Sequence, residues 1–214
     1  MDKKWGFLRE TREDAAKAGV DLDTGVCRTG LDEYLEVIFP DVNDWIHDQS
    51  IKINGKALID EKGNTIRTRP DYWSEQQHLV VEFDGLPHYT NPDVILKDIE
   101  NTQRYEKAGF KVVRIPYFIQ LSRNAVKTLF RVDVEQELFD ETIPSMGLKG
   151  RNTPAYLCHE GIKRMAREFV RFPKQYQVNL KALKDANNSI LTGVELLEEY
   201  NQLKVELSNK KECQ

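Results

Sequence analysis

Three carboxylates in the middle of this sequence have the spacing that a metal site on two neighbouring strands requires. Asp71 follows Pro70, and after a polar stretch Glu82 and Asp84 flank Phe83 in an apolar segment. Carboxylates gathered in this way repel one another and are costly to remove from water, so folded proteins usually pair them with a cation. Mg²⁺ suits oxygen ligands and phosphate chemistry, and Mn²⁺ can substitute for it. The spacing therefore predicts a Mg²⁺ site that hydrolyses phosphodiester bonds.

The segments that carry these acids predict a β-hairpin. Residues 65–73 and 79–84 have the composition of strands on either side of a short polar loop. In an antiparallel pairing around a loop of four residues, Asp71 lies opposite Glu82, with Cβ atoms roughly 5 Å apart on one face. A register that differs by one residue would separate the two side chains. Asp84 shares this face because side chains alternate along a strand. The alternative is a solvated sheet face that carries acids by chance, but the apolar residues around Glu82 are typical of a central strand.

The remaining segments predict an α/β fold, a mixed central β-sheet flanked by helices. Asn91, followed by a proline and an acid, has the pattern of a helix start, and Gly109 has that of a helix end. We expect helices over residues 6–18, 30–39, 92–108 and 123–130, and further strands over 51–53, 57–59 and 110–115. Residues 1–140 form the predicted α/β core, and residues 150–214 form a helical, partly basic C-terminal extension.

Composition limits the class of protein. Of the 214 residues, 40% are hydrophobic and 31% are charged, as in globular proteins. No apolar run approaches the ~20 residues of a membrane span, and the charged start does not resemble a secretory signal. The three cysteines form no paired motif, which favours a reducing compartment. We therefore expect a cytoplasmic protein that does not contact a membrane.

The net charge of −4 hides a basic region between residues 149 and 184, which contains nine basic and two acidic residues. The cations that we expect to bind DNA are Lys163, Arg164, Arg167, Arg171 and Lys174. The three arginines follow one another at steps of three and four, so they lie on one helix face. A contact with the DNA backbone is one interpretation. An ordinary solvated helix face packed on the core is the other.

The order of the motifs resembles the PD-(D/E)XK nuclease superfamily. The resemblance covers about residues 29–131 and rests on Arg-Pro-Asp71, Glu82-Phe-Asp84-Gly-Leu-Pro-His88, Asp98 and the strand Gly-Phe-Lys-Val-Val-Arg-Ile at 109–115. The E-x-D-G-x-x-H run is most similar to the very-short-patch-repair-endonuclease-like group. The resemblance implies a restriction-endonuclease-like fold, in which Asp71 is the first metal-binding aspartate and Glu82 is the second acid.

At Asp84 the sequence departs from this superfamily, which has a lysine there. Such a lysine positions or activates the attacking water and stabilises the charge of the transition state. Asp84 can instead hold a second metal or accept the proton of the water. A cation from His88, Lys97 or Lys111 can replace the lysine. The departure also leaves open a catalytically inactive nuclease-like fold.

Three other positions are candidates for the site. His88 lies directly after the predicted strand, as a general acid–base group or leaving-group stabiliser, or else as an ordinary surface or core histidine. Asn101 and Tyr105 are similar to the Gln-x-x-x-Tyr helix of RecB-like nucleases. Glu33, or the acid before it, corresponds to the acid that this superfamily often contributes from its first helix. Glu33 and Asn101, with Lys97, are therefore accessory candidates.

Together these features predict a Mg²⁺-dependent DNA endonuclease of the restriction or repair kind, with Asp71, Glu82 and Asp84 as metal ligands and His88 as a catalytic group. One alternative is a catalytically inactive nuclease-like module that binds nucleic acid or a partner protein. Another is an RNA-directed nuclease. An apolar stripe over residues 191–207 is either core packing or a seam for a homodimer or a partner subunit.

Overall fold

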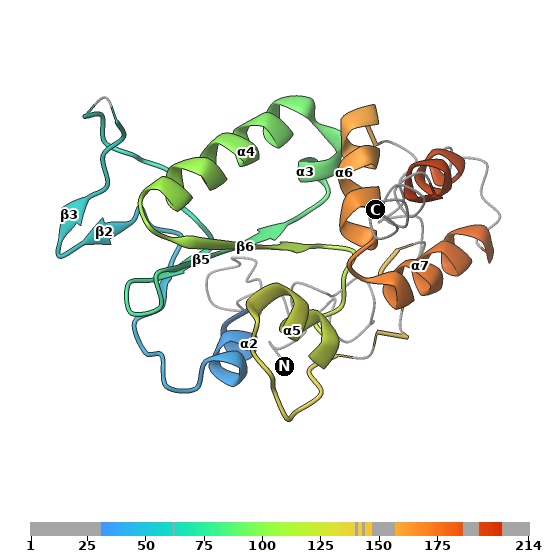
Figure 1. Cartoon of the computed structure of the whole chain (residues 1–214), viewed down its shortest axis with the longest axis horizontal. Coiled ribbons are helices and arrows are strands. Elements are labelled where there is room, and N and C mark those ends of the chain that lie inside the picture. The colour runs from blue at the N-terminus through green and yellow to red at the C-terminus, as the bar shows by residue number, and fades with distance from the viewer. Residues whose placement is uncertain are drawn as a thin grey trace, which may run out of the picture.

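The computed structural model describes residues 31–61, 63–139, 141–142, 144–146, 157–185 and 193–202. Within these ranges a mixed sheet of four strands is flanked by helices, as the sequence predicts (Figure 1). The helix predicted over residues 6–18 lies outside the described residues, and so does the side chain of Glu33 in helix α2 (Leu31–Ile38). None of the described helices is long and apolar enough to cross a membrane.

The main sheet has the strand order β1–β4–β5–β6. Its strands are β1 (Ile46–His47), β4 (Tyr72–Ser74), β5 (Leu79–Asp84) and β6 (Lys111–Pro116). The pairs β1–β4 and β4–β5 are antiparallel, whereas β5 and β6 run parallel. The sequence reasoning missed β1, whose two residues are too few to show an alternating pattern.

The predicted strand over residues 65–73 is wrong in its extent. Only Tyr72–Ser74 pairs with β5, and before it the structure has a single bridge between Ile59 and Thr65. Pro70 explains the late start, because proline has no N–H with which to continue the ladder.

The register between β4 and β5 confirms the predicted hairpin. Ser74 pairs with Leu79, and the two pairs that follow continue the same register toward Asp71 and Glu82. His78 closes the turn in a left-handed conformation, with φ of 46°. The pairing brings Asp71 next to β5 at the position of Glu82.

The predicted hairpin between residues 51 and 59 also forms, but outside the main sheet. Strands β2 (Lys52–Ile53) and β3 (Lys56–Ala57) pair with each other in a separate two-stranded sheet. Asn54 and Gly55 have φ values of 48° and 76°, and positive φ at both central residues is the mark of the type I′ turn that Asn-Gly favours.

The connection from β5 to β6 contains helices α3 (Pro87–Thr90) and α4 (Pro92–Lys107). Parallel neighbours require such a crossover, and α4 covers one face of the sheet. The predicted start is confirmed, because the side chain of Asn91 accepts a hydrogen bond from the N–H of Asp93. Gly109, with φ of 88°, follows the end of the helix as predicted.

Different helices cover the two faces of β5 (Figure 1). Leu79 and Val81 belong to the main apolar core, together with residues of α2 and α5 (Arg123–Phe130). Val80 points to the other face, where it joins Tyr105 of α4 in a second apolar cluster. Because side chains alternate along a strand, Glu82 and Asp84 lie on the α4 face.

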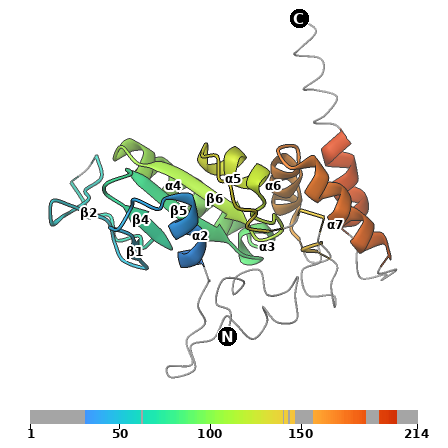
Figure 2. The same cartoon turned by 90° about the horizontal axis from the view of Figure 1, so that it is seen from below.

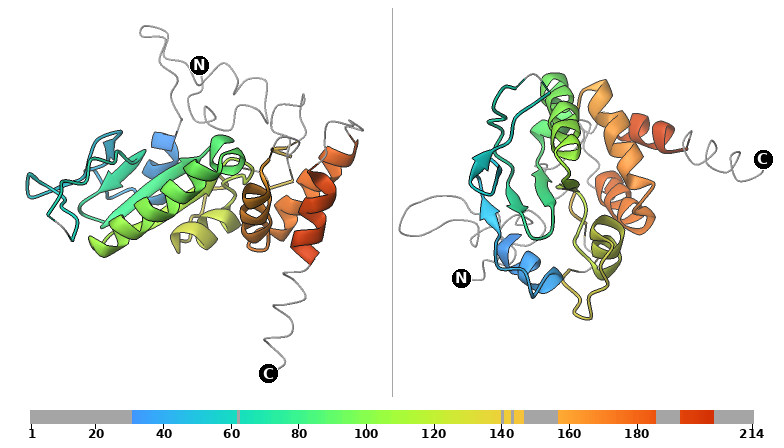
Figure 3. Two further views of the ribbon diagram at one scale, coloured as in Figure 1. Left: turned by 90° about the horizontal axis from the view of Figure 1, so that it is seen from above. Right: turned by 60° about the vertical axis from the view of Figure 1, so that its left-hand side comes forward.

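Helices α6 (His159–Phe169) and α7 (Pro173–Asp185) lie beyond one end of the sheet, and residues 194–202 are helical as well (Figures 2 and 3). Helix α6 packs against α3 and α4. Its apolar side chains, among them Met165 and Phe169, belong to the same core cluster as β5. The described part of the C-terminal extension thus shares the core of the sheet.

Candidate active site

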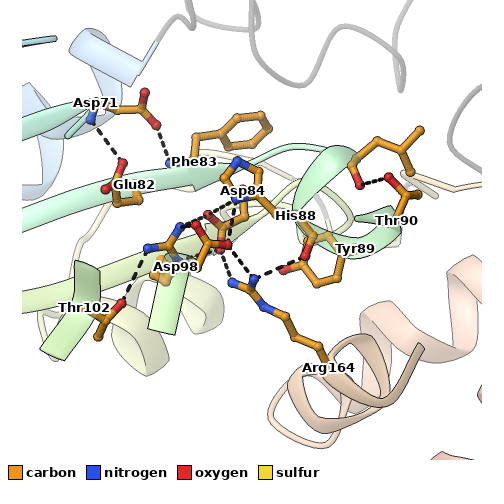
Figure 4. Close-up of polar contacts among 12 residues, drawn as sticks. Asp71, Glu82, Phe83, Asp84, His88, Tyr89, Thr90, Asp98, Thr102 and Arg164 are labelled. Carbon is orange, nitrogen blue, oxygen red and sulfur yellow. Dashed lines mark hydrogen bonds and ion pairs between the residues drawn. The ribbon is translucent and has the colours of Figure 1, made fainter. Parts of the chain in front are cut away.

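Four elements place charged side chains on the α4 face of the sheet. Strand β5 contributes Glu82 and Asp84, and β6 contributes Arg114, which pairs with Glu82 across the parallel ladder. Asp98 comes from α4 and Arg164 from α6 (Figure 4). The side chains meet because the crossover helix and α6 both border the end of β5.

Asp71 and Glu82 lie opposite each other, as the hairpin predicts. The backbone N–H of Asp71 donates to Oε2 of Glu82 at 3.2 Å. In return, Oδ2 of Asp71 accepts from the backbone N–H of Phe83 at 2.7 Å. These two bonds fix both carboxylates against the end of β5 (Figure 4).

The Asp71–Glu82 pair forms no ion pair with a basic residue in the part of the chain that the structure describes. Among the residues that the structure describes, neither carboxylate has a lysine, arginine or histidine nitrogen within the 4.0 Å of an ion pair. Burial raises the pKa of Asp71, an effect that the bond from Phe83 only partly offsets and that the charge of Asp84 reinforces. Burial, with the charges of Asp71 and Asp84, raises the pKa of Glu82 to about 7, although Arg114 acts in the opposite direction. The pair is therefore a place where bound positive charge would be stabilising.

Asp84 is in the opposite situation, because two arginines neutralise it. Its side chain is fully buried and accepts from Nε and Nη2 of Arg114 at 2.8 and 2.6 Å. Nη2 of Arg164 reaches the same carboxylate at 2.5 Å. The two bonds from Arg114 form the bidentate arrangement that makes arginine–carboxylate pairs strong.

Asp98 shares both arginines and also binds His88. Nη2 of Arg114 and Nη1 of Arg164 approach its carboxylate at 2.9 and 2.7 Å. Nδ1 of His88 lies 2.7 Å from Oδ2 of Asp98. Burial alone would raise the pKa of Asp98, but the bond with His88 and the arginine charges hold it below its usual value. Burial alone would lower the pKa of His88, but the bond with Asp98 and the charge of Asp84 raise it.

Asp84, His88 and Asp98 form a group that could hold a metal ion. Each offers one ligand atom, and these atoms lie within 4.8 Å of one another. Two oxygens and one imidazole nitrogen suit transition metals better than Mg²⁺. A dication here would have to compete with two guanidinium groups for the same oxygens. The three predicted metal ligands thus fall into two groups, the unneutralised Asp71–Glu82 pair and the arginine-bound Asp84.

Tyr89 connects this network to helix α6. Its hydroxyl donates to Oε2 of Glu168 at 2.5 Å, and the guanidinium of Arg164 lies over its ring at 4.9 Å. Nε of Arg164 also contacts Oε1 of Glu168 at 3.2 Å. Burial raises the pKa of Glu168 to about 7, despite the opposing charge of Arg164. Tyr89, the neighbour of His88 in the chain, is therefore held against α6.

Among the described residues, neither lysine that was predicted to supply the missing cation forms an ion pair with Asp84. Lys97 is exposed on α4, and Nζ of Lys111 donates to the backbone carbonyl of Phe130 at 3.2 Å. Asn101 accepts from Arg104 on its own helix. The basic groups that reach Asp84 are Arg114, Arg164 and His88, whose Nδ1 lies 3.5 Å from Oδ1 of Asp84. Of these the sequence reasoning had named His88 as a replacement for the lysine and Arg164 as a DNA-binding residue.

Two residues of the site were missed from the sequence. Arg114 interrupts an otherwise apolar stretch of β6, and a charged residue within an apolar strand is the same signal that identified Glu82. Asp98 belonged to the motifs of the resemblance but had no assigned role. No local pattern pairs it with His88, because the contact depends on how α4 packs.

The basic residues of the C-terminal region do not form one face of free cations. Lys163 pairs with Glu160, Lys174 with Glu141, and Arg171 donates to the carbonyl of Thr128 and lies over the ring of Phe172. Arg164 lies in the site with 12% of its side chain exposed. Arg167 is exposed on α6.

Comparison of the chain with protein-family models, with curated proteins and with solved structures finds no match.

Proposed function

We propose that this chain is a metal-dependent phosphodiesterase, and specifically an endonuclease that cleaves DNA. The observation that carries the proposal is the Asp71–Glu82 pair, two partly buried carboxylates held together by hydrogen bonds without a basic partner among the described residues. Burial raises both pKa values, so the ionised pair is unfavourable until a cation binds. Because both residues offer only oxygen, Mg²⁺ or Mn²⁺ is the cation that they suit.

In this proposal each residue of the site has a defined task. Asp71 and Glu82 would bind the cation, which lowers the pKa of a water molecule and offsets the charge of the phosphoryl group. Asp98 engages Nδ1 of His88 and orients its ring, so that Nε2 remains to exchange a proton with the water or the leaving oxygen.

In this proposal Arg114 and Arg164 replace the lysine that is missing at the position of Asp84. The resemblance has a lysine where this chain has Asp84, and a lysine there supplies positive charge close to the reaction. Arg114 and Arg164 bring two positive charges to that point, and Asp84 holds them in place. Asp84 would then act by anchoring cations, and its role as a direct metal ligand becomes the second option.

The order of elements supports the same proposal. Helix α2, the antiparallel strands β1, β4 and β5, helix α4 and the parallel strand β6 occur in this order in the chain, with β2 and β3 between β1 and β4 and α3 before α4. A mixed sheet flanked by helices is compatible with the fold that the resemblance implies. The choice of DNA as substrate rests on the resemblance. Arg167 is exposed on α6 and could contact a phosphate backbone.

One observation favours a second candidate, an inactive nuclease-like module that binds nucleic acid or a partner. Both carboxylates of the Asp84–Asp98 group are bound to arginines, which is the state of a closed structural network. Such a network needs no metal and no substrate. A cleavage experiment separates the two candidates.

The experiment incubates the full chain with single- and double-stranded DNA and with RNA, in Mg²⁺, in Mn²⁺ and in EDTA. The variants are Asp71→Asn and Glu82→Gln, which keep the shape of each side chain but remove its charge. The control is Glu100→Gln, an acid on α4 whose side chain is 63% exposed. We expect cleavage of DNA that depends on the metal and falls by about 100-fold or more in both variants, because several kcal/mol of charge stabilisation is lost.

Metal-dependent cleavage that survives both substitutions would refute the assignment of the site. Cleavage of RNA alone would retain the phosphodiesterase and change its substrate. If the wild-type chain cleaves none of these substrates but binds them, the inactive module is the correct reading.

A further inference from the structure

Helix α6 approaches the site so closely that only glycine fits at the contact. A Cβ atom on Gly161 would lie 1.6 Å from the carbonyl oxygen of Tyr89, far inside any real contact. Arg164 follows three residues later and so lies on the same face of the helix. The close approach at Gly161 is therefore what brings Arg164 within reach of Asp84 and Asp98.

Arg164 uses its whole guanidinium on the site. Its nitrogens contact Asp84 at 2.5 Å, Asp98 at 2.7 Å, the backbone carbonyl of His88 at 3.2 Å and Glu168 at 3.2 Å. The carbonyl of His88 and the carboxylate of Asp98 both accept a hydrogen bond from Nη1 of Arg164. Because Asp98 also binds the ring of His88, this one nitrogen holds His88 both through its main chain and, by way of Asp98, through its ring. A planar group with donors in fixed directions can do this, whereas a lysine ammonium cannot reach all four acceptors.

The charges of the network also require Arg164. Asp84 and Asp98 bring two negative charges into a buried place, and Arg114 alone supplies one positive charge. Removing the second arginine leaves a buried carboxylate without a counter-charge, and the side chains around it must rearrange or take up a proton. His88, which contacts both carboxylates, is the residue that this rearrangement reaches first.

We infer that Arg164 is a positioning residue, through which helix α6 holds the ring and main chain of His88 in the geometry that the site requires. The inference rests on the proposed function insofar as His88 is its proton-transfer group. It extends that function by making the C-terminal helical region a working part of the site.

The test compares Arg164→Met and Arg164→Lys with the control Arg104→Met. Arg104 is also paired with a glutamate on a helix, but its side chain is 45% exposed and lies outside the proposed machinery. The first readout is the nuclear magnetic resonance spectrum of the histidine rings. The chain has four histidines, so a His88→Gln variant assigns the signal of interest.

We expect the ring signal of His88 to shift or broaden in Arg164→Met and to move less in Arg164→Lys. The signals of His47 and His78 should stay in place in both variants, and all four should stay in place in Arg104→Met. An unmoved His88 signal in Arg164→Met overturns the inference. So does a similar displacement of all four signals, because that result indicates a general structural role. If Arg164→Met does not fold, Arg164→Lys decides by the same criteria.

The second readout is the kinetics of cleavage. Positioning predicts that kcat falls by about 10- to 100-fold in Arg164→Met while KM stays within about twofold, with partial rescue in Arg164→Lys. A change in KM alone would assign Arg164 to substrate binding and overturn the inference. The histidine spectra do not depend on cleavage, so they decide the role of Arg164 even if the wild-type chain proves inactive and the proposed function fails.

Discussion

The pKa of Glu82 leads to a prediction that needs no substrate. In the folded chain this pKa is raised from 4.5 to about 7, mainly by burial. Between these two values the folded state keeps a proton that the unfolded state has released, so the free energy of unfolding falls as the pH rises. The slope is about 1.4 kcal/mol per pH unit for one carboxyl group, and the whole range corresponds to about 3 kcal/mol.

Glu82→Gln isolates this contribution, because glutamine resembles the protonated acid and can still accept the N–H bond of Asp71. We expect the variant to gain stability relative to wild type as the pH rises from 5 to 8, by up to about 3 kcal/mol. Glu168, whose pKa is also about 7, is present in both proteins, so its contribution cancels in the difference.

Urea denaturation at pH 5, 6, 7 and 8 in EDTA measures the difference, with Glu100→Gln as the exposed control. Adding Mg²⁺ at pH 8 should reduce the gap, because the cation stabilises the ionised pair of the wild type and has little to bind in the variant. At a concentration 100 times the dissociation constant, that stabilisation is about 2.7 kcal/mol. A difference in unfolding free energy that is the same at every pH would refute the assignment of a raised pKa to Glu82, and with it the electrostatic basis of the metal site.

Two further substitutions test the packing around the site by urea denaturation. Gly161→Ala should cost about 3 kcal/mol, because its Cβ would lie 1.6 Å from a backbone oxygen and α6 would have to shift. The control Gly85→Ala meets only an ordinary contact at 3.8 Å and should cost much less. Equal losses of stability in the two variants would contradict the close approach of α6. Asp84→Ala should cost about 3–5 kcal/mol, because it removes the fully buried carboxylate that both arginines bind and leaves them Asp98 as their shared acceptor. Asp133→Ala, in an exposed pair with Lys127, should cost less than about 1 kcal/mol. A loss at Asp84 as small as that at Asp133 would mean that Asp98 alone is sufficient for both arginines.

Much of the local structure could be predicted from the sequence. The turn at Asn54-Gly55, the cap at Asn91 and the register of the β4–β5 hairpin all follow from short-range rules that the structure confirms. The length of β4 was overestimated because most residues between 65 and 73 are of types found in strands, and Pro70, which cannot donate a hydrogen bond to the ladder, was given too little weight. The strand β1 was missed because its two residues are too few to show the alternation of apolar and polar side chains that marks a strand.

The sequence by itself determined that Asp71 and Glu82 face each other, because both lie in one hairpin whose loop sets the register. Only the tertiary structure decided what Asp84 does. Its partner Arg164 lies 80 residues away in the chain and reaches it because α6 packs on α3 at Gly161. A helical pattern shows that the arginines of α6 share a face, but which of them is buried against a carboxylate depends on packing between elements that no local periodicity describes.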